Sequence, residues 1–289
     1  MAKMTKKTEE RIQAGLAKFQ KVLAIAKTRD LNESDTVSII NDILSDVFGY
    51  DKYLEVTSEL AVRGTYCDLA IKCGEKFQYL IECKAIGTDL KDNHLRQAVN
   101  YGANKGIQWV ILTNGADWQV YRIRFEQPIQ WDLVARFDLS TGSAKDERFM
   151  ESLFLVSKEG VEKCARDDVF EKIQCVNRFV IGAILLSEPV VSAVKRELKK
   201  LADGVRIDDA EIASLIRESV IRRDLVEGEE AICAATKLAR LSKASKPRRE
   251  PQKPEQSDST VAPGQSLSES LLNAAEAAQA PSAPPPPVP

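Results

Sequence analysis

The chain has 289 residues, with 41 Lys+Arg against 43 Asp+Glu, one His and six Cys. Because 44% of the residues are hydrophobic, the chain can bury a core, which excludes collagen-like, coil-only and disulfide-scaffold proteins. A net charge of −2 gives no global field that indicates a nucleic-acid or membrane partner. The cysteines form no CxxC pair, and the sequence contains neither a membrane-spanning apolar run nor a secretory signal. We therefore expect a cytoplasmic protein without membrane contact or structural zinc.

The first half of the chain predicts two helices followed by a sheet. Helical spacing covers residues 5–28, and a second helix follows the cap candidates Ser34 and Asp35 and stops at Gly49. Short segments rich in β-branched and aromatic residues then predict strands. These strands span residues 54–62, 65–73, 77–84, 109–113 and 118–125, with a helix at 92–105 between the third and the fourth. The order predicts an α/β or α+β fold, in which helices flank a mixed sheet.

The second half of the chain predicts helices and then a tail. Helical spacing continues from residue 143 to 244, with breaks at Pro189, Gly204 and Gly228 and a cap at Asp208 or Asp209. After residue 246 the composition is rich in Pro, Ser and Ala, which predicts a disordered tail. A capping-box pattern in residues 266–280 predicts a helix that forms on a partner. We expect a sheet domain at 1–140, an all-helical domain at 141–245 and the tail at 246–289.

The hairpin predicted at residues 65–84 carries the chemistry. Side chains alternate along a strand, so Glu82 and Lys84 share one face. If the hairpin closes around residues 74–76, residues whose numbers sum to 150 are opposed, and Asp68 lies across from Glu82. Opposed residues have Cβ atoms about 5 Å apart, so the two carboxylates can share a hard divalent cation. The Lys84 ammonium can stabilise charge on an attacked phosphate. The pattern predicts a Mg²⁺-dependent phosphodiesterase site.

The same residues resemble a known family. Asp68 followed by Glu82-Cys83-Lys84 on the next strand resembles the signature of the PD-(D/E)XK nuclease superfamily. Residues 36–124 are similar to the N-terminal nuclease domain of type I restriction enzyme R subunits. The resemblance implies a restriction-endonuclease-like fold, in which Asp68, Glu82 and the Cys83 carbonyl bind Mg²⁺ or Mn²⁺. It also implies that Lys84 is the catalytic lysine. Gln97 and Tyr101 would be the QxxxY pair that supports DNA binding.

The resemblance implies a Mg²⁺-dependent restriction-type DNA endonuclease that acts in prokaryotic defence or DNA processing, with DNA as its partner. No GxxxxGK[ST] phosphate loop occurs, so we expect no ATP-driven motor in this chain. The alternative is a non-catalytic nuclease-fold module that binds nucleic acid or protein, in which the acids and the lysine form a surface salt-bridge cluster. A protein partner bound through the helical region or the tail, and a homo-oligomer, are further alternatives.

Several residues are less clearly assigned. Many superfamily members add an acid from the first helix, and Asp35, Asp42 and Asp46 are all candidates here. For Gln97 and Tyr101, packing of an amphipathic helix is an equal alternative to a functional role. His94 is expected to be a solvated residue at the helix start. Cys67 and Cys83 are expected to be core thiols that oppose each other on the apolar face of the hairpin.

Overall fold

The structure of the protein is a computed structural model that describes residues 3–62, 65–201 and 204–244. Contacts divide the chain into two units, Met1–Lys243 and Ala244–Pro289. The predicted tail at 246–289, with its helix at 266–280, lies outside the described residues. Across the described ranges, no helix has both the length and the apolar character needed to cross a bilayer.

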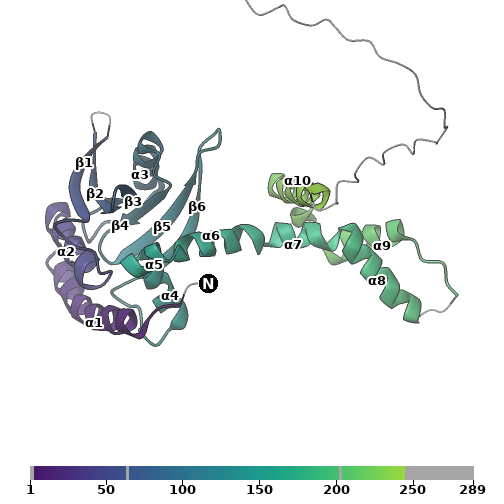
Figure 1. Ribbon diagram of the computed structural model, residues 1–289, viewed down its shortest axis with the longest axis horizontal. Coiled ribbons are helices and arrows are strands. Elements are labelled where there is room, and N and C mark those ends of the chain that lie inside the picture. Colours follow the sequence, from purple (N-terminus) through teal and green to yellow (C-terminus); the bar gives the residue numbers. More distant parts are fainter. Residues whose placement is uncertain (1–2, 63–64, 202–203, 245–289) are drawn as a thin grey trace, which may run out of the picture. The chain divides into compact units, whose positions relative to one another are not determined.

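Six strands of the described chain form one mixed sheet (Figure 1). Its order is β1-β2-β3-β4-β5-β6, and each neighbouring pair is antiparallel except β3 and β4, which are parallel. A parallel pair needs a crossover connection, which helix α3 (Asp92–Lys105) supplies. The strands are β1 (Val56–Val62), β2 (Thr65–Cys73), β3 (Lys76–Cys83), β4 (Trp109–Thr113), β5 (Asp117–Arg124) and β6 (Gln130–Asp138). The predicted mixed α/β sheet is confirmed.

Helices cover both faces of this sheet. Helices α1 (Lys6–Thr28) and α2 (Glu33–Asp46) pack on one face, and α3 packs on the other. The strand β4 shows the two layers: Trp109 and Ile111 join the core of α1 and α2, whereas Val110 and Leu112 join the core beneath α3. Every residue of β4 is buried, as expected for a central strand with helices on both sides.

Three helices after the sheet extend the core on the side of α1 and α2. They are α4 (Glu147–Val156), α5 (Lys158–Glu162) and α6 (Ala165–Cys175). Leu153, Phe154 and Ala165 belong to the same buried cluster as α1 and α2. The division of the chain at residue 140 stays a prediction. The remaining helices are α7 (Arg178–Leu185), α8 (Glu188–Leu201), α9 (Asp209–Leu215) and α10 (Glu229–Ala244), with short turns at Ile216–Val220 and Arg223–Leu225.

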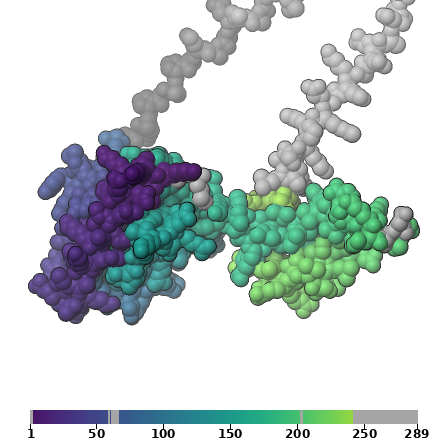
Figure 2. Space-filling model, turned by 90° about the horizontal axis from the view of Figure 1, so that it is seen from below, coloured from purple at the N-terminus to yellow at the C-terminus, as the bar shows by residue number. Residues whose placement is uncertain are grey.

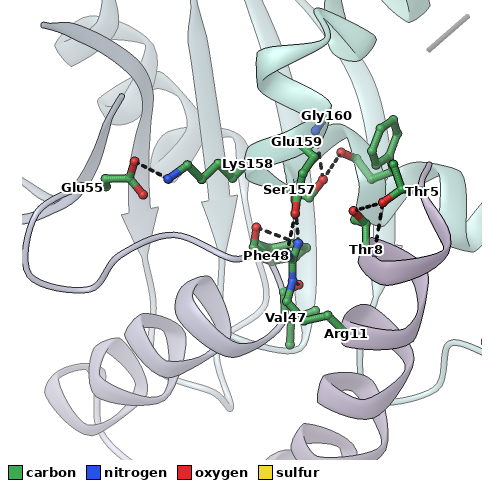
Figure 3. Close-up of polar contacts among 11 residues, drawn as sticks. Thr5, Thr8, Arg11, Val47, Phe48, Glu55, Ser157, Lys158, Glu159 and Gly160 are labelled. Atoms are coloured by element: carbon green, nitrogen blue, oxygen red, sulfur yellow. Dashed lines mark hydrogen bonds and ion pairs between the residues drawn. The ribbon is translucent and has the colours of Figure 1, made fainter. Parts of the chain in front are cut away.

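A polar clasp joins α5 to the N-terminal helices (Figure 3). The Arg11 guanidinium donates to the carbonyls of Val47 and Phe48, at 3.2 and 3.3 Å. These two residues directly follow the last residue of α2, Asp46. It also binds both carboxylate oxygens of Glu159 at 2.5 and 2.7 Å, and this hydrogen bonding lowers the pKa of Glu159. The Lys158 backbone N–H donates to the Phe48 carbonyl at 2.9 Å. Figure 2 shows α1 in purple beside the teal segment that contains α5.

Two buried tyrosine hydroxyls also hold the end of α4. Tyr50 Oη donates to the Val156 carbonyl at 2.7 Å, and Tyr79 Oη donates to the Leu155 carbonyl at 2.9 Å. Replacing Tyr50 with phenylalanine leaves a buried carbonyl unpaired, so we expect it to lower the free energy of unfolding by about 1–2 kcal/mol in urea titrations. The matched control is Tyr53→Phe, because Tyr53 is 89% exposed. Equal midpoints for the two variants would contradict the role of the Tyr50 hydroxyl.

The structure corrects several predicted boundaries. Helix α2 begins at Glu33 with Asn32 as its cap, not at Ser34 or Asp35, because Asn32 Oδ1 accepts from the Asp35 backbone N–H at 2.9 Å. The predicted strands omit β6, and several strand ends differ by one or two residues. The helical character of the second region is confirmed, with Pro189 in the first turn of α8 and Asp208 as the cap of α9.

Candidate active site

The β2–β3 hairpin has the predicted register over the part that carries the acids. Leu69 pairs with Ile81 and Ala70 with Leu80, so the paired numbers sum to 150. A bulge between Ile71 and Lys72 shifts the pairs nearer the turn by one residue, and the prediction is wrong there. Continued one residue beyond Leu69, the register brings Asp68 beside Glu82. Asp68 Oδ2 accepts a hydrogen bond from the Cys83 backbone N–H at 2.7 Å, which ties it to β3.

Glu82 is a buried acid with an unsatisfied oxygen. The residue is only 1% exposed, and its Oε1 accepts from Lys84 Nζ at 2.7 Å. Its Oε2 is also buried and has no hydrogen-bond partner among the described residues. Burial raises the pKa of Glu82 to about 7; the hydrogen bond from Lys84 opposes this shift and the nearby Asp68 charge adds to it. An orphaned oxygen at this depth is costly unless the site holds a further partner.

Lys84 presents its ammonium to the acids. Its backbone N–H donates to the Thr113 carbonyl at 2.8 Å, which fixes the end of β3 against β4. The side chain is 15% exposed, and Nζ lies 3.7 Å from Glu33 Oε2 as well as 2.7 Å from Glu82. Burial lowers the pKa of Lys84, but the hydrogen bond and charge of Glu82 outweigh it, so the net shift is upward. Lys84 therefore stays protonated at neutral pH and acts as a cation rather than a base.

The helix acid that approaches the site is Glu33. Two of the sequence candidates instead form ion pairs elsewhere, Asp42 with Lys52 and Asp46 with Lys18, both at 2.6 Å. Asp35 lies in the first turn of α2, next to the cap. Glu33 is missed by the sequence reasoning because the predicted cap lay too late, which left this residue outside the helix. The available signal was Asn32, a strong cap residue directly before it.

Helix α3 lies over the same hairpin. Tyr101 packs in a buried cluster with Cys67, Ala70 and Leu80, and its hydroxyl accepts from Gln97 Nε2 at 3.0 Å. The two residues therefore share one helical face, as their spacing predicts. Cys67 and Cys83 are both buried, so the prediction of core thiols is confirmed. The predicted shared face is wrong, because Cys83 lies in the cluster with α1 and α2, whereas Cys67 lies in the cluster with Tyr101 of α3.

His94 lies in the first turn of α3, as expected, but it is half-buried rather than fully solvated. Burial lowers the pKa of His94, and the positive charges of Lys84 and Lys91 lower it further. The imidazole is therefore neutral at physiological pH. It contributes no charge to the site, and the positive charge there comes from Lys84.

The donor set fits a hard divalent cation. The Asp68 and Glu82 carboxylates supply oxygen ligands, which Mg²⁺ prefers, and the unpartnered Glu82 Oε2 is the atom that a cation would satisfy. Over the described ranges, His, Cys, Asp and Glu side chains form no metal-binding group of three or more. Further ligands would thus be backbone carbonyls, substrate oxygens or water, which Mg²⁺ commonly uses beside one or two carboxylates.

Comparison with known proteins identifies a relationship over part of the chain. Residues 39–131 match the family described as type I restriction enzyme R protein N terminus. The predicted resemblance is therefore confirmed for the segment that contains Asp68, Glu82, Lys84, Gln97 and Tyr101. Glu33, α1 and the helices after β6 lie outside the matched segment. No curated protein and no solved structure matches the chain.

Proposed function

We propose, from the match of residues 39–131 to type I restriction R protein N termini, that this protein is a Mg²⁺-dependent DNA endonuclease of the restriction type. It hydrolyses phosphodiester bonds in prokaryotic defence or DNA processing. The observation that carries the proposal is the buried Glu82, whose Oε2 has no hydrogen-bond partner in the described part of the chain, while the Lys84 ammonium donates to Oε1 at 2.7 Å. A salt-bridge cluster kept only for stability would not require a carboxylate oxygen left unsatisfied at this depth.

The metal site is proposed on three groups of the hairpin. The Asp68 and Glu82 carboxylates and the Cys83 carbonyl would hold Mg²⁺, or Mn²⁺ in its place. When bound, Mg²⁺ polarises a phosphoryl oxygen and neutralises charge on it. The hydrogen bond from the Cys83 N–H to Asp68 orients this carboxylate before the metal arrives. Glu82 must lose its proton to bind the metal; because burial raises its pKa to about 7, about half of the carboxyl is ionised at neutral pH, and metal binding would favour the ionised form.

Lys84 is proposed as the catalytic lysine. Its ammonium is protonated and held at the acid pair, so it can stabilise the charge that develops on the phosphate under attack. Gln97 and Tyr101 are proposed to support DNA binding from α3. Tyr101 anchors the pair in the hydrophobic cluster over the hairpin, while the Gln97 side chain is exposed next to its hydroxyl. Gln97 is thus the member that can contact a nucleic acid.

The test is incubation of supercoiled plasmid with the purified full chain in Mg²⁺ or Mn²⁺, with EDTA as the control. Nicking or linearisation that needs the metal supports the proposal. The absence of cleavage together with salt-sensitive DNA binding would instead support the non-catalytic nuclease-fold module. The cytoplasmic location, a protein partner and a homo-oligomer stay predictions.

A further inference from the structure

A polar pocket lies at the other end of β3 from the acid pair. Its volume is about 390 Å³, and it is lined by residues from β3, α3, β4, β5 and α6. Four cationic side chains contribute to it, namely Lys76, Lys105, Arg122 and Arg166, against the two acids Glu75 and Asp167. The two acids offset only two of these four positive charges. Glu75 is fully exposed and pairs with Lys72, which is outside the pocket lining, and Asp167 pairs with Arg122 at 2.9 Å.

The guanidinium of Arg166 is buried in the wall of this pocket and held there by fixed contacts. Its side chain is only 8% exposed, and its Cζ lies over two rings, 4.5 Å from the Tyr79 centroid and 5.0 Å from that of Trp109. It donates to the carbonyl and the side-chain oxygen of Gln78, at 2.9 and 2.6 Å. Both acceptors are neutral. Its Nε donates to no acceptor in the described part of the chain, and its ion pair with Asp167 Oδ2 is long, at 3.7 Å.

Arg166 is a buried cation whose hydrogen-bond acceptors are neutral, and its one ion pair, to Asp167 at 3.7 Å, leaves its Nε donor unused. Such a group is preorganised for an anion. Arg122 adds a second guanidinium, stacked 4.9 Å from the Trp109 centroid, so the pocket wall positions two rigid forks. Lys76 and Lys105 lie at the exposed rim. The chemistry that matches two guanidinium forks and two ammonium groups is a phosphate.

The position of the pocket connects it to the acid pair. On α3, residues 97, 101 and 105 recur every four positions and share one face, so this face leads from the proposed active site to Lys105. Phe77 and Ile107 line the pocket and also belong to the cluster beneath Tyr101. Glu82 follows Phe77 by five residue steps, which is about 16 Å along β3. This distance matches the axial rise of roughly five base pairs of duplex DNA.

We infer that this pocket binds a backbone phosphate of the DNA substrate, roughly five base pairs from the phosphate that is cleaved. The inference rests on the proposed function, which supplies DNA as the substrate. Its role is to position the strand, since none of its residues touches the acid pair. Free nucleotides carry the same phosphate chemistry, and the test separates these two sources.

The test measures binding of a labelled duplex of about 14 base pairs by fluorescence anisotropy in EDTA, so that cleavage plays no part. The full chain is compared with Lys76→Glu/Lys105→Glu, with the charge-preserving Lys76→Arg/Lys105→Arg, and with Lys21→Glu/Lys145→Glu, whose lysines are also exposed. We expect the first variant to weaken binding at least about tenfold and to reduce the salt slope by about 2. The other two should bind within about threefold of the wild type.

Arg166→Lys tests the buried fork directly. We expect it to weaken duplex binding because a lysine cannot provide the bidentate geometry. Since Arg166 also packs on two rings, its circular dichroism spectrum must match that of the wild type; if it does not, the rim variants decide the question. Equal losses in the pocket and control pairs would overturn the inference. So would competition by ATP at lower concentration than by unlabelled duplex, which would assign the pocket to a free nucleotide.

These outcomes are independent of the proposed reaction. If DNA binding depends on the pocket but the protein does not cleave plasmid, the endonuclease proposal is contradicted and the phosphate pocket is supported. Metal-dependent cleavage by a protein whose DNA binding is unchanged in Lys76→Glu/Lys105→Glu would do the reverse.

Discussion

Replacing Lys84 with alanine is expected to lower the rate of Mg²⁺-dependent plasmid cleavage by at least about 100-fold. The reason is electrostatic: a preorganised donor aimed at developing charge in a half-buried site typically contributes 10²–10³-fold. The ammonium of Lys84 is such a donor, because it is 15% exposed and its raised pKa keeps it protonated. The measurement is the initial nicking rate at saturating metal.

The matched control is Lys72→Ala. Lys72 lies on the same hairpin and pairs with the exposed Glu75 at 3.4 Å, away from the acid pair. This variant should cleave at nearly the wild-type rate. Circular dichroism and thermal melts of both variants establish that the fold is retained. If Lys84→Ala cut plasmid as fast as Lys72→Ala, Lys84 would not be the catalytic lysine.

The metal-free protein is expected to lose stability as the pH rises from about 4.5 to 7, and Glu82→Gln is expected to remove this loss. Burial raises the pKa of Glu82 from 4.5 to about 7 in the folded protein. Between these values the folded state binds more protons than the unfolded state, so the unfolding free energy falls with rising pH. The shift corresponds to a pH-dependent loss on the order of 3 kcal/mol.

The measurement is urea denaturation in EDTA at several pH values for wild type, Glu82→Gln and the control Glu75→Gln. Glu75 is fully exposed, so its variant should follow the wild-type pH profile. Only the pH-dependent difference is compared, because Glu82→Gln also removes the ion pair with Lys84. Parallel profiles for wild type and Glu82→Gln would show that the buried carboxyl is not protonated near neutral pH.

The hairpin is the part of the fold that the sequence predicts best. Gly74 has φ +60°, which suits glycine at the turn, and the alternation of apolar side chains predicts the pairing of Leu69 with Ile81 and of Ala70 with Leu80. The strand β6 could not be found in this way. Trp131 and Leu133 are exposed while Val134 and Ala135 are buried side by side, because a bulge in the β5–β6 ladder interrupts the alternation.

For the candidate active site, the sequence identifies the side chains on one hairpin but not those brought in by other elements. The approach of Glu33 to Lys84 depends on where α2 begins relative to the end of β3, which is a tertiary property. The pocket around Arg166 is likewise hidden, since it combines residues 88 positions apart in an interaction with Gln78. Local periodicity contains no information about such pairs.

The contact between Arg11 and Glu159 shows that helices before and after the sheet belong to one packed unit, which matters for the design of fusion proteins. The family match stops at residue 131, yet the buried cluster continues to Ala165. A fragment limited to the matched segment would expose the part of the hydrophobic core that Leu153 and Phe154 cover. It would also lack the carbonyls that accept hydrogen bonds from the Tyr50 and Tyr79 hydroxyls. A fragment used in a fusion protein should therefore begin at α1 and extend beyond the first residues of α6.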